Sequence, residues 1–158
     1  MKKNGKKKLA AVLACLLAAL FIVQVPVQAA SSVSCSKLYD AVKGKCNKGA
    51  EKVSKKSKCT FLSYSYRKSV EDFYYATDSS QVYCVCIVKA GRTSDAKDIK
   101  KEFDSIKKEK KSDSYLKKDE KKLVKDARCG RSGSYVWYIC LGSKSDNKKA
   151  EKALKKAL

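Results

Sequence analysis

Histidine is absent from the 158 residues of this chain. Its absence excludes Ser-His-Asp and Cys-His catalysis, the most common general base, and metal sites built on imidazole. No two cysteines have the Cys-x-x-Cys spacing of zinc ribbons and thioredoxin-like redox sites. We therefore expect a protein that is not an enzyme, has no catalytic residues and binds no cofactor or metal.

Arginine is scarce as well. The chain has 37 basic and 16 acidic residues, and only four of the basic residues are arginine. Because arginine is the side chain of bidentate phosphate recognition, we do not expect sequence-specific nucleic-acid binding. Two interpretations of the lysine excess stay open. It is typical of a solvated surface, and it also predicts attraction to anionic envelope polymers or lipid headgroups.

Residues 1–29 have the organisation of a secretory signal peptide. Five lysines precede an apolar run over residues 9–23, and small residues follow Pro26 up to Ala29. The run has 15 residues, whereas a membrane-spanning helix needs roughly twenty. We expect cleavage after Ala29, which leaves 129 residues with 32 basic and 16 acidic side chains and no membrane span. The expected location is secreted or associated with the cell envelope, and retention as an uncleaved anchor stays open.

Cys15 is the residue that a lipid anchor would use. A lipidated cysteine is expected at the end of the apolar run, with a small residue two positions before it. Cys15 instead lies in the middle of the run, and Leu13 is bulky. We therefore do not expect lipid anchoring through Cys15, and we interpret it as an apolar residue of the signal segment.

Seven cysteines remain after cleavage, and an exported location permits disulfides between them. They are Cys35, Cys46, Cys59, Cys84, Cys86, Cys129 and Cys140. Since the number is odd, at least one has no partner within the chain, and the sequence does not determine the connectivity. Cys84 and Cys86 share one face of a strand and are expected to be core residues or partners of other cysteines. We expect Cys140 to lie near Cys84 or Cys86 if their strands are adjacent, and not to bond to Cys129.

Apolar periodicity predicts an order of helix, hairpin, helix, hairpin and helix. The expected elements are a helix over 36–46, strands over 70–76 and 81–90, a helix from 93, a short helix near 119–125, strands over 127–131 and 135–141, and a helix from 145. Residues 47–58 are expected to form an exposed connection. Residues 59–67 have the composition of a strand but no evident partner.

The strands over 81–90 and 135–141 are apolar on both faces, which indicates interior strands. Short hairpins favour antiparallel pairing. The expected fold class is therefore α+β, an antiparallel sheet of two hairpins with helices packed on one face. The expected organisation is a signal peptide over 1–29, an N-terminal helix and lysine-rich connection over 30–69, and an α+β domain over 70–158.

From Val70 to Leu158 the chain resembles an uncharacterised domain of small exported proteins and lipoproteins of Gram-positive bacteria, clostridia especially. The resemblance rests on VYCVCIVKA, SDAKDIKKEFDSIKKEKKSDSY, GSYVWYICL and DNKKAEKALKKAL, in this order. It implies an extracytoplasmic α+β domain with no assigned activity or ligand, so no functional residues are carried over. The chain departs from the family in its poor lipidation motif and its many cysteines.

The expected function is that of an exported basic protein without enzymatic activity, acting in the cell envelope or outside the cell. One alternative is a secreted cationic effector on anionic membranes, although the lysines are spread over every predicted helix. The other is a carboxylate-dependent hydrolase. Glu71 and Asp72 do not support it as a pair, because neighbours on a strand point to opposite faces.

Overall fold

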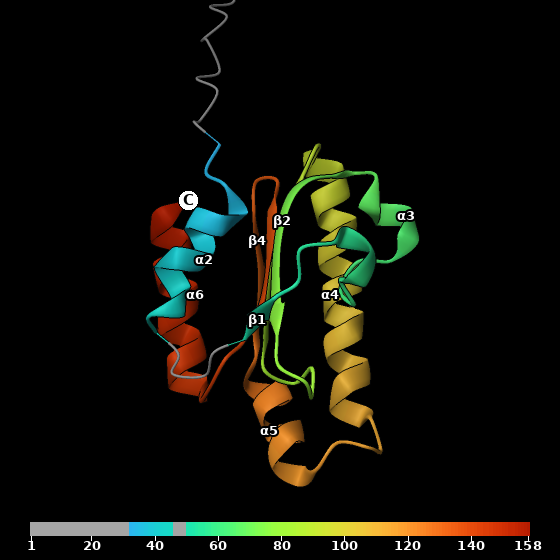
Figure 1. The fold of residues 1–158 in the computed structure, drawn as a ribbon, viewed down its shortest axis with the longest axis vertical. Coiled ribbons are helices and arrows are strands. Elements are labelled where there is room, and N and C mark those ends of the chain that lie inside the picture. Colours follow the sequence, from blue (N-terminus) through green and yellow to red (C-terminus); the bar gives the residue numbers. More distant parts are fainter. Residues whose placement is uncertain (1–31, 46–49) are drawn as a thin grey trace, which may run out of the picture. The chain divides into compact units, whose positions relative to one another are not determined.

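Strand β3 (Cys84–Ala90) is the central strand of the sheet, and six of its seven side chains are buried. The structure, a computed structural model, describes residues 32–45 and 50–158 (Figure 1). The strand order is β1-β2-β3-β5-β4, and every neighbouring pair is antiparallel. The remaining strands are β1 (Glu51–Lys52), β2 (Val70–Thr77), β4 (Arg128–Ser132) and β5 (Tyr135–Cys140). The prediction that the two apolar strands are interior is confirmed.

Five α-helices accompany the sheet in the described residues. They are α2 (Cys35–Lys43), α3 (Tyr64–Arg67), α4 (Thr93–Ser112), α5 (Lys118–Asp126) and α6 (Lys144–Ala157), with a 3-10 turn, η1 (Lys56–Lys58). The α+β class, the antiparallel sheet and the predicted order of helices and hairpins are confirmed. The predicted signal peptide, Cys15 and Cys46 lie outside the described residues.

Helices cover both faces of the sheet, so the expectation that they pack on one face is wrong. Cys86 and Val88 of β3 belong to a core beneath α4, together with Phe103. Val85 and Ile87, which alternate with them, belong to a second core beneath α2 and α6. Figure 1 shows these helices on opposite sides of the strands. The physical reason is that an interior strand with apolar side chains on both faces must be covered on both.

The segment before β2 differs from its expected form. Residues 47–58 contain β1, in which Glu51 pairs with Thr77 and Lys52 with Ala76. Both β1 side chains are exposed, so apolar periodicity gives no signal for this pairing. Residues 59–67 form a turn and α3 instead of a strand. The buried Phe61 ring packs at 5.4 Å from Phe103 of α4, so the apolar residues of this segment cover the core.

Helix α6 begins at Lys144, one residue before the predicted start at 145. Its N-cap is Ser143, whose hydroxyl accepts from the Asp146 backbone N–H at 3.3 Å. The Asp146 carboxylate in turn accepts from the Ser143 backbone N–H, which completes a capping box. Ala150 and Leu154 are buried against the sheet, and the lysines of the helix are exposed.

Among residues 32–45 and 50–158, we find no helix that combines the length and the apolar character needed to cross a membrane.

Candidate functional site

Helix α6 presents its lysines on one side. All six are exposed, and we call them the lysine face: Lys144, Lys148, Lys149, Lys152, Lys155 and Lys156. At 3.6 residues per turn they fall within a sector of about 140°. Ala150 and Leu154, on the opposite side, are fully buried. The packing of α6 on the sheet therefore turns a continuous row of ammonium groups toward solvent.

The two acidic residues of α6 lie outside this sector. Asp146 is held in the capping box, and Glu151 is turned to the sheet with only 5% of its surface exposed. Glu151 accepts from Arg128 at 2.7 Å and lies 3.3 Å from the Lys155 ammonium group. Burial opposes ionisation, but the Arg128 hydrogen bond and charge hold the pKa of Glu151 below its ordinary value. Within the described residues, the other five lysines of the face form no salt bridge, although the capping-box hydrogen bond and, to a lesser extent, the charge of Lys149 lower the pKa of Asp146.

Helix α4 is a useful contrast because its lysines are mostly compensated. It carries seven lysines and five acidic residues, whereas α6 carries six and two. Lys100 pairs with Asp104 at 2.5 Å, and Lys101 pairs with Asp98 at 2.9 Å. Lys107 donates to the Ala127 carbonyl oxygen, so part of its positive charge is directed inward. The uncompensated charge is therefore greater on α6 than on α4.

The cysteines predicted as disulfide candidates lie mainly on one side of the sheet. The α4-side core includes Cys59, Cys84, Cys86 and Cys140, and Cys129 packs against it. Cys35 is buried in the α2–α6 core, and Cys46 lies outside the described residues. The six described cysteines are thiols in this structure.

Strand register brings some of these cysteines together. Cys84 is directly opposite Cys140 on β5, as expected for adjacent strands, whereas Cys129 is opposite Tyr138. The Cys59 and Cys86 sulfur atoms are 3.7 Å apart.

Burial sets the ionisation of most of these thiols. It raises the pKa of Cys129 and that of Cys140 to about 12. It also raises the pKa of Cys86 well above its ordinary value. Cys59 differs, because its hydrogen bond with Cys86 favours the thiolate and lowers the pKa of Cys59. A nucleophilic thiol needs a thiolate and access, so the raised values are typical of structural cysteines.

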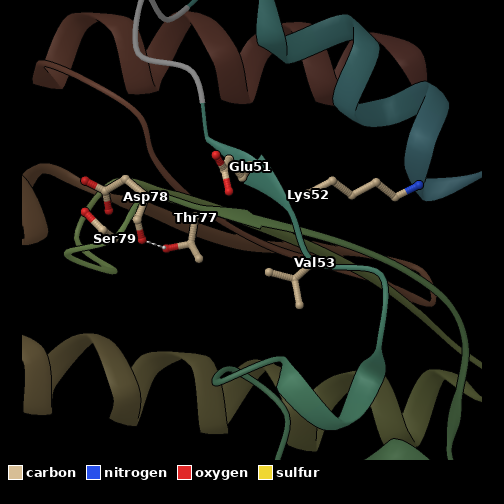
Figure 2. A pocket seen from close by; sticks show the side chains of 6 residues that line it. All are labelled: Glu51, Lys52, Val53, Thr77, Asp78 and Ser79. Atoms are coloured by element: carbon tan, nitrogen blue, oxygen red, sulfur yellow. Dashed lines mark hydrogen bonds between the residues drawn. The ribbon is translucent and has the colours of Figure 1, made fainter.

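A pocket at the sheet edge holds two carboxylates. Its volume is about 450 Å³, and it is lined by Glu51, Lys52, Val53, Thr77, Asp78 and Ser79. Figure 2 shows Lys52 and Val53 pointing away from the carboxylates of Glu51 and Asp78. Both Asp78 oxygens accept from the Ser80 hydroxyl, at 2.9 and 2.8 Å, so this carboxylate stabilises the β2–β3 turn. Glu51 is exposed, and the pair therefore lacks the burial that tunes a catalytic acid.

The other acidic candidates are engaged in structural contacts. Glu71 pairs with Lys89 at 2.6 Å, and Asp72 accepts from the Cys35 backbone N–H at 2.7 Å. The two carboxylates thus have separate partners, as expected for neighbours on a strand. A second pocket of about 440 Å³ is lined by Tyr83, Asp119, Lys122, Leu123, Asp126, Gly142 and Ser143. Among the described residues, no group of three or more cysteine, aspartate or glutamate side chains is placed to hold a metal ion.

Reasoning from the sequence placed the lysines of the last helix opposite its apolar residues Ala150, Ala153, Leu154 and Ala157, but it did not identify this lysine face as a site. We expected lysines to be spread over every helix, which is correct as a distribution along the chain. The signal was present in residues 144–156, where lysines recur at helical spacing and only Asp146 and Glu151 are acidic. Placing both acids on a helical projection would have shown that neither interrupts the sector.

Comparison with known proteins found a protein-family model that matches less than half of the chain. Searches among curated proteins and among solved structures found no match to the chain. The match begins at residue 66, inside α3 and four residues before the start at Val70 expected from the resemblance. It ends at Leu141, just after β5, and therefore leaves out α2, β1 and α6. Residues 66–141 match the model of the family described as Domain of unknown function (DUF4358), and the lysine face lies outside the matched region.

Proposed function

We propose that this is an exported, non-enzymatic protein that associates with anionic polymers of the cell envelope through the lysine face of α6. The observation that carries the proposal is the set of five exposed lysines on α6 that form no salt bridge in the described residues. Clustered cationic charge of this kind attracts polyanions and raises their rate of association.

Export is supported by the sequence of residues 1–29. The order of basic, apolar and small residues there is that of a cleavable secretory signal. An exported chain with this charge meets the anionic polymers and headgroups of the envelope as its first partners. The Gram-positive setting implied by the resemblance agrees with such a location.

A polymer fits the lysine face better than a bilayer does. A helix that binds a membrane surface inserts an apolar face into the headgroup region. The apolar face of α6 is instead used against the sheet, where Ala150 and Leu154 are fully buried. The exposed large apolar side chains among the described residues are Tyr64, Tyr115 and Leu158, and none lies within the lysine face. Lysine ammonium groups on flexible stems also suit an irregular row of anionic groups.

A charge-neutralised variant tests this interface. Lys148, Lys149, Lys152 and Lys156 are changed to Gln, and Lys155 is kept because it lies near Glu151 and 5.6 Å over the Trp137 ring. The matched control removes the same charge from four exposed lysines of α4 and α5: Lys97, Lys108, Lys111 and Lys118. Binding of the full chain to inorganic polyphosphate is measured by fluorescence anisotropy at about 50 mM and about 300 mM NaCl.

The α6 variant is expected to bind polyphosphate at least about tenfold more weakly at the lower salt concentration, with a reduced salt dependence. The control variant is expected to lose no more than about threefold. Equal losses in both variants would contradict a localised interface. Vesicles that contain phosphatidylglycerol serve as the second probe. Dye release from them would favour the membrane effector instead.

Export is tested separately in a secreting bacterial host. Intact mass of the protein, after thiol blocking without reductant, reports the cleavage site, any lipid and the number of free thiols together. We expect a product that begins after Ala29 and is recovered from the envelope fraction by high salt. Recovery only in the medium, with no affinity for the wall, would contradict envelope association.

A further inference from the structure

Cys59 and Cys86 are far apart in the sequence but in contact in the fold. Their sulfur atoms are 3.7 Å apart, across 27 positions of the chain, and both residues are buried. A disulfide bond is about 2.05 Å long, so the two sulfurs need to approach by about 1.7 Å. We propose that Cys59 and Cys86 form a disulfide that fastens the segment over residues 53–63 to the central strand of the sheet.

The strand register makes this pairing specific. The partners of Cys86 on the neighbouring strands are Tyr75 of β2 and Tyr138 of β5, so no cysteine lies directly beside it in the sheet. Cys59 reaches it from the segment that covers this face. Cys84 shares that face but lies opposite Cys140. The two cysteines of β3 therefore have different neighbours, although only one residue separates them.

The fastened segment has a structural task and few regular contacts. Its buried Phe61 and Leu62 close the α4-side core. Its hydrogen bonds include the Val53 N–H with the Tyr75 carbonyl at 2.8 Å, and the Ser63 N–H with a Glu102 carboxylate oxygen at 2.9 Å. The segment is also rich in lysine, which disfavours its docking on a cationic domain. A covalent bond to β3 would keep the core covered.

The reaction is an exchange with a disulfide-type oxidant, either a small-molecule disulfide or a protein disulfide. The Cys59 thiolate attacks one sulfur of the oxidant, forms a mixed disulfide and releases one thiol. The Cys86 thiolate then attacks the Cys59 sulfur and expels the second thiol. The two cysteines lose two protons and two electrons, which reduce the oxidant to two thiols. Since both side chains are buried, the exchange takes place before the segment has docked.

Peptide mapping of the full chain tests the connection. The reduced and unfolded protein is refolded in the presence of oxidised glutathione, remaining thiols are blocked with N-ethylmaleimide, and the protein is digested with trypsin without reductant. Cleavage after Lys58 and Arg67 releases Cys59 in the peptide 59–67, and Cys86 is released in the peptide 69–89. We expect these two peptides to be recovered as one disulfide-linked species. Its mass should be lower by two hydrogen atoms than the sum of the two peptides with Cys59 and Cys86 as free thiols.

Cys84→Ala is the matched control, because Cys84 is in the same tryptic peptide and on the same face of β3. The link should persist in Cys84→Ala and disappear in Cys86→Ala. Oxidation should raise the Tm of the wild type and of Cys84→Ala by about 10 °C, and this shift should be lost in Cys86→Ala.

The wild-type map alone can overturn the proposal, even if a variant fails to fold. Recovery of the peptide 59–67 without a linked partner and with alkylated Cys59 would overturn the proposal. A link from this peptide to one that carries Cys35, Cys129 or Cys140 would also do so. Loss of the link in Cys84→Ala, with retention in Cys86→Ala, would assign the bond to Cys84 instead.

Discussion

At the scale of single residues, the tightest constraint is at Gly130 of β4. Gly130 is paired with Trp137 of β5, and a Cβ atom at position 130 would lie 2.4 Å from the indole Cζ2 atom. Trp137 is fully buried, and its Nε1 group donates to a Glu151 oxygen at 3.3 Å. Burial and this hydrogen bond restrain the indole, so the absence of a side chain at Gly130 is a packing requirement.

Gly130→Ala is expected to destabilise the protein by about 3 kcal/mol, because the added methyl group forces the buried indole or the strand to shift. The free energy of unfolding in urea measures the effect. Gly44→Ala is the control, since no atom of the described residues lies within 4 Å of the added Cβ, and its effect should stay within about 0.5 kcal/mol. Similar urea midpoints for both variants and the wild type would show that the indole does not cover Gly130.

At the scale of elements, two buried polar residues attach α6 to the sheet. Asn147 accepts from the Leu141 N–H at 2.9 Å and donates to the Asp126 carbonyl oxygen at 3.2 Å, so it joins the ends of β5, α5 and the start of α6. Glu151 connects the middle of α6 to Arg128 of β4. These contacts set the rotation of α6 about its axis, and that rotation decides which side of the helix faces solvent.

The Glu151 contacts predict a loss of stability in acid. Since folding lowers the pKa of Glu151, its contribution is complete above its ordinary value of 4.5 and is lost as the pH falls through the folded value. Urea unfolding between about pH 7 and about pH 3 measures the loss. Glu151→Gln should be less stable than the wild type by about 1 kcal/mol at pH 7, with the gap closing in acid. An equal gap at every pH would argue against an ionised Glu151 in the fold.

At the scale of the whole molecule, positive charge is the dominant property. Residues 30–158 carry 32 basic and 16 acidic side chains. Ion pairs such as those of α4 each use one charge of either sign, so they leave this excess of positive charge unchanged. A net charge of this size opposes the compact state through self-repulsion. The same property that favours polyanion binding is therefore a cost to folding, which a polyanion or dissolved salt can relieve.

Stability is accordingly expected to rise with ionic strength. Between about 20 mM and about 500 mM NaCl, Tm should increase by several degrees, because salt screens the repulsion among the lysines. Thermal unfolding followed by circular dichroism measures this. The variant with four glutamines on α6 should show a smaller increase than the wild type. A Tm that falls with salt would indicate that ion pairs such as Lys100–Asp104 outweigh the repulsion.

The predictions from the sequence succeeded where a local pattern carries the information. The interior character of β3 follows from the apolar run over 84–88, and α4 follows from its single apolar stripe at Ala96, Ile99 and Phe103. Strand β1 gave no such signal, because its two residues are exposed and are defined as a strand only by their backbone pairing with β2. The contact between Cys59 and Cys86 could not be predicted from the sequence either, since it depends on a segment that folds back over the sheet.

The amino-acid sequence by itself determined the α+β class, the order of the elements and the strong positive charge, because periodicity, turn chemistry and composition are local properties. The tertiary structure decided that both sheet faces are covered, that Cys59 meets Cys86, and that Glu151 of α6 is buried against Arg128 of β4. The physical reason is that each of these outcomes depends on how distant segments pack. The ion pair of Glu151, for example, depends on Arg128, which is 23 positions away in the sequence.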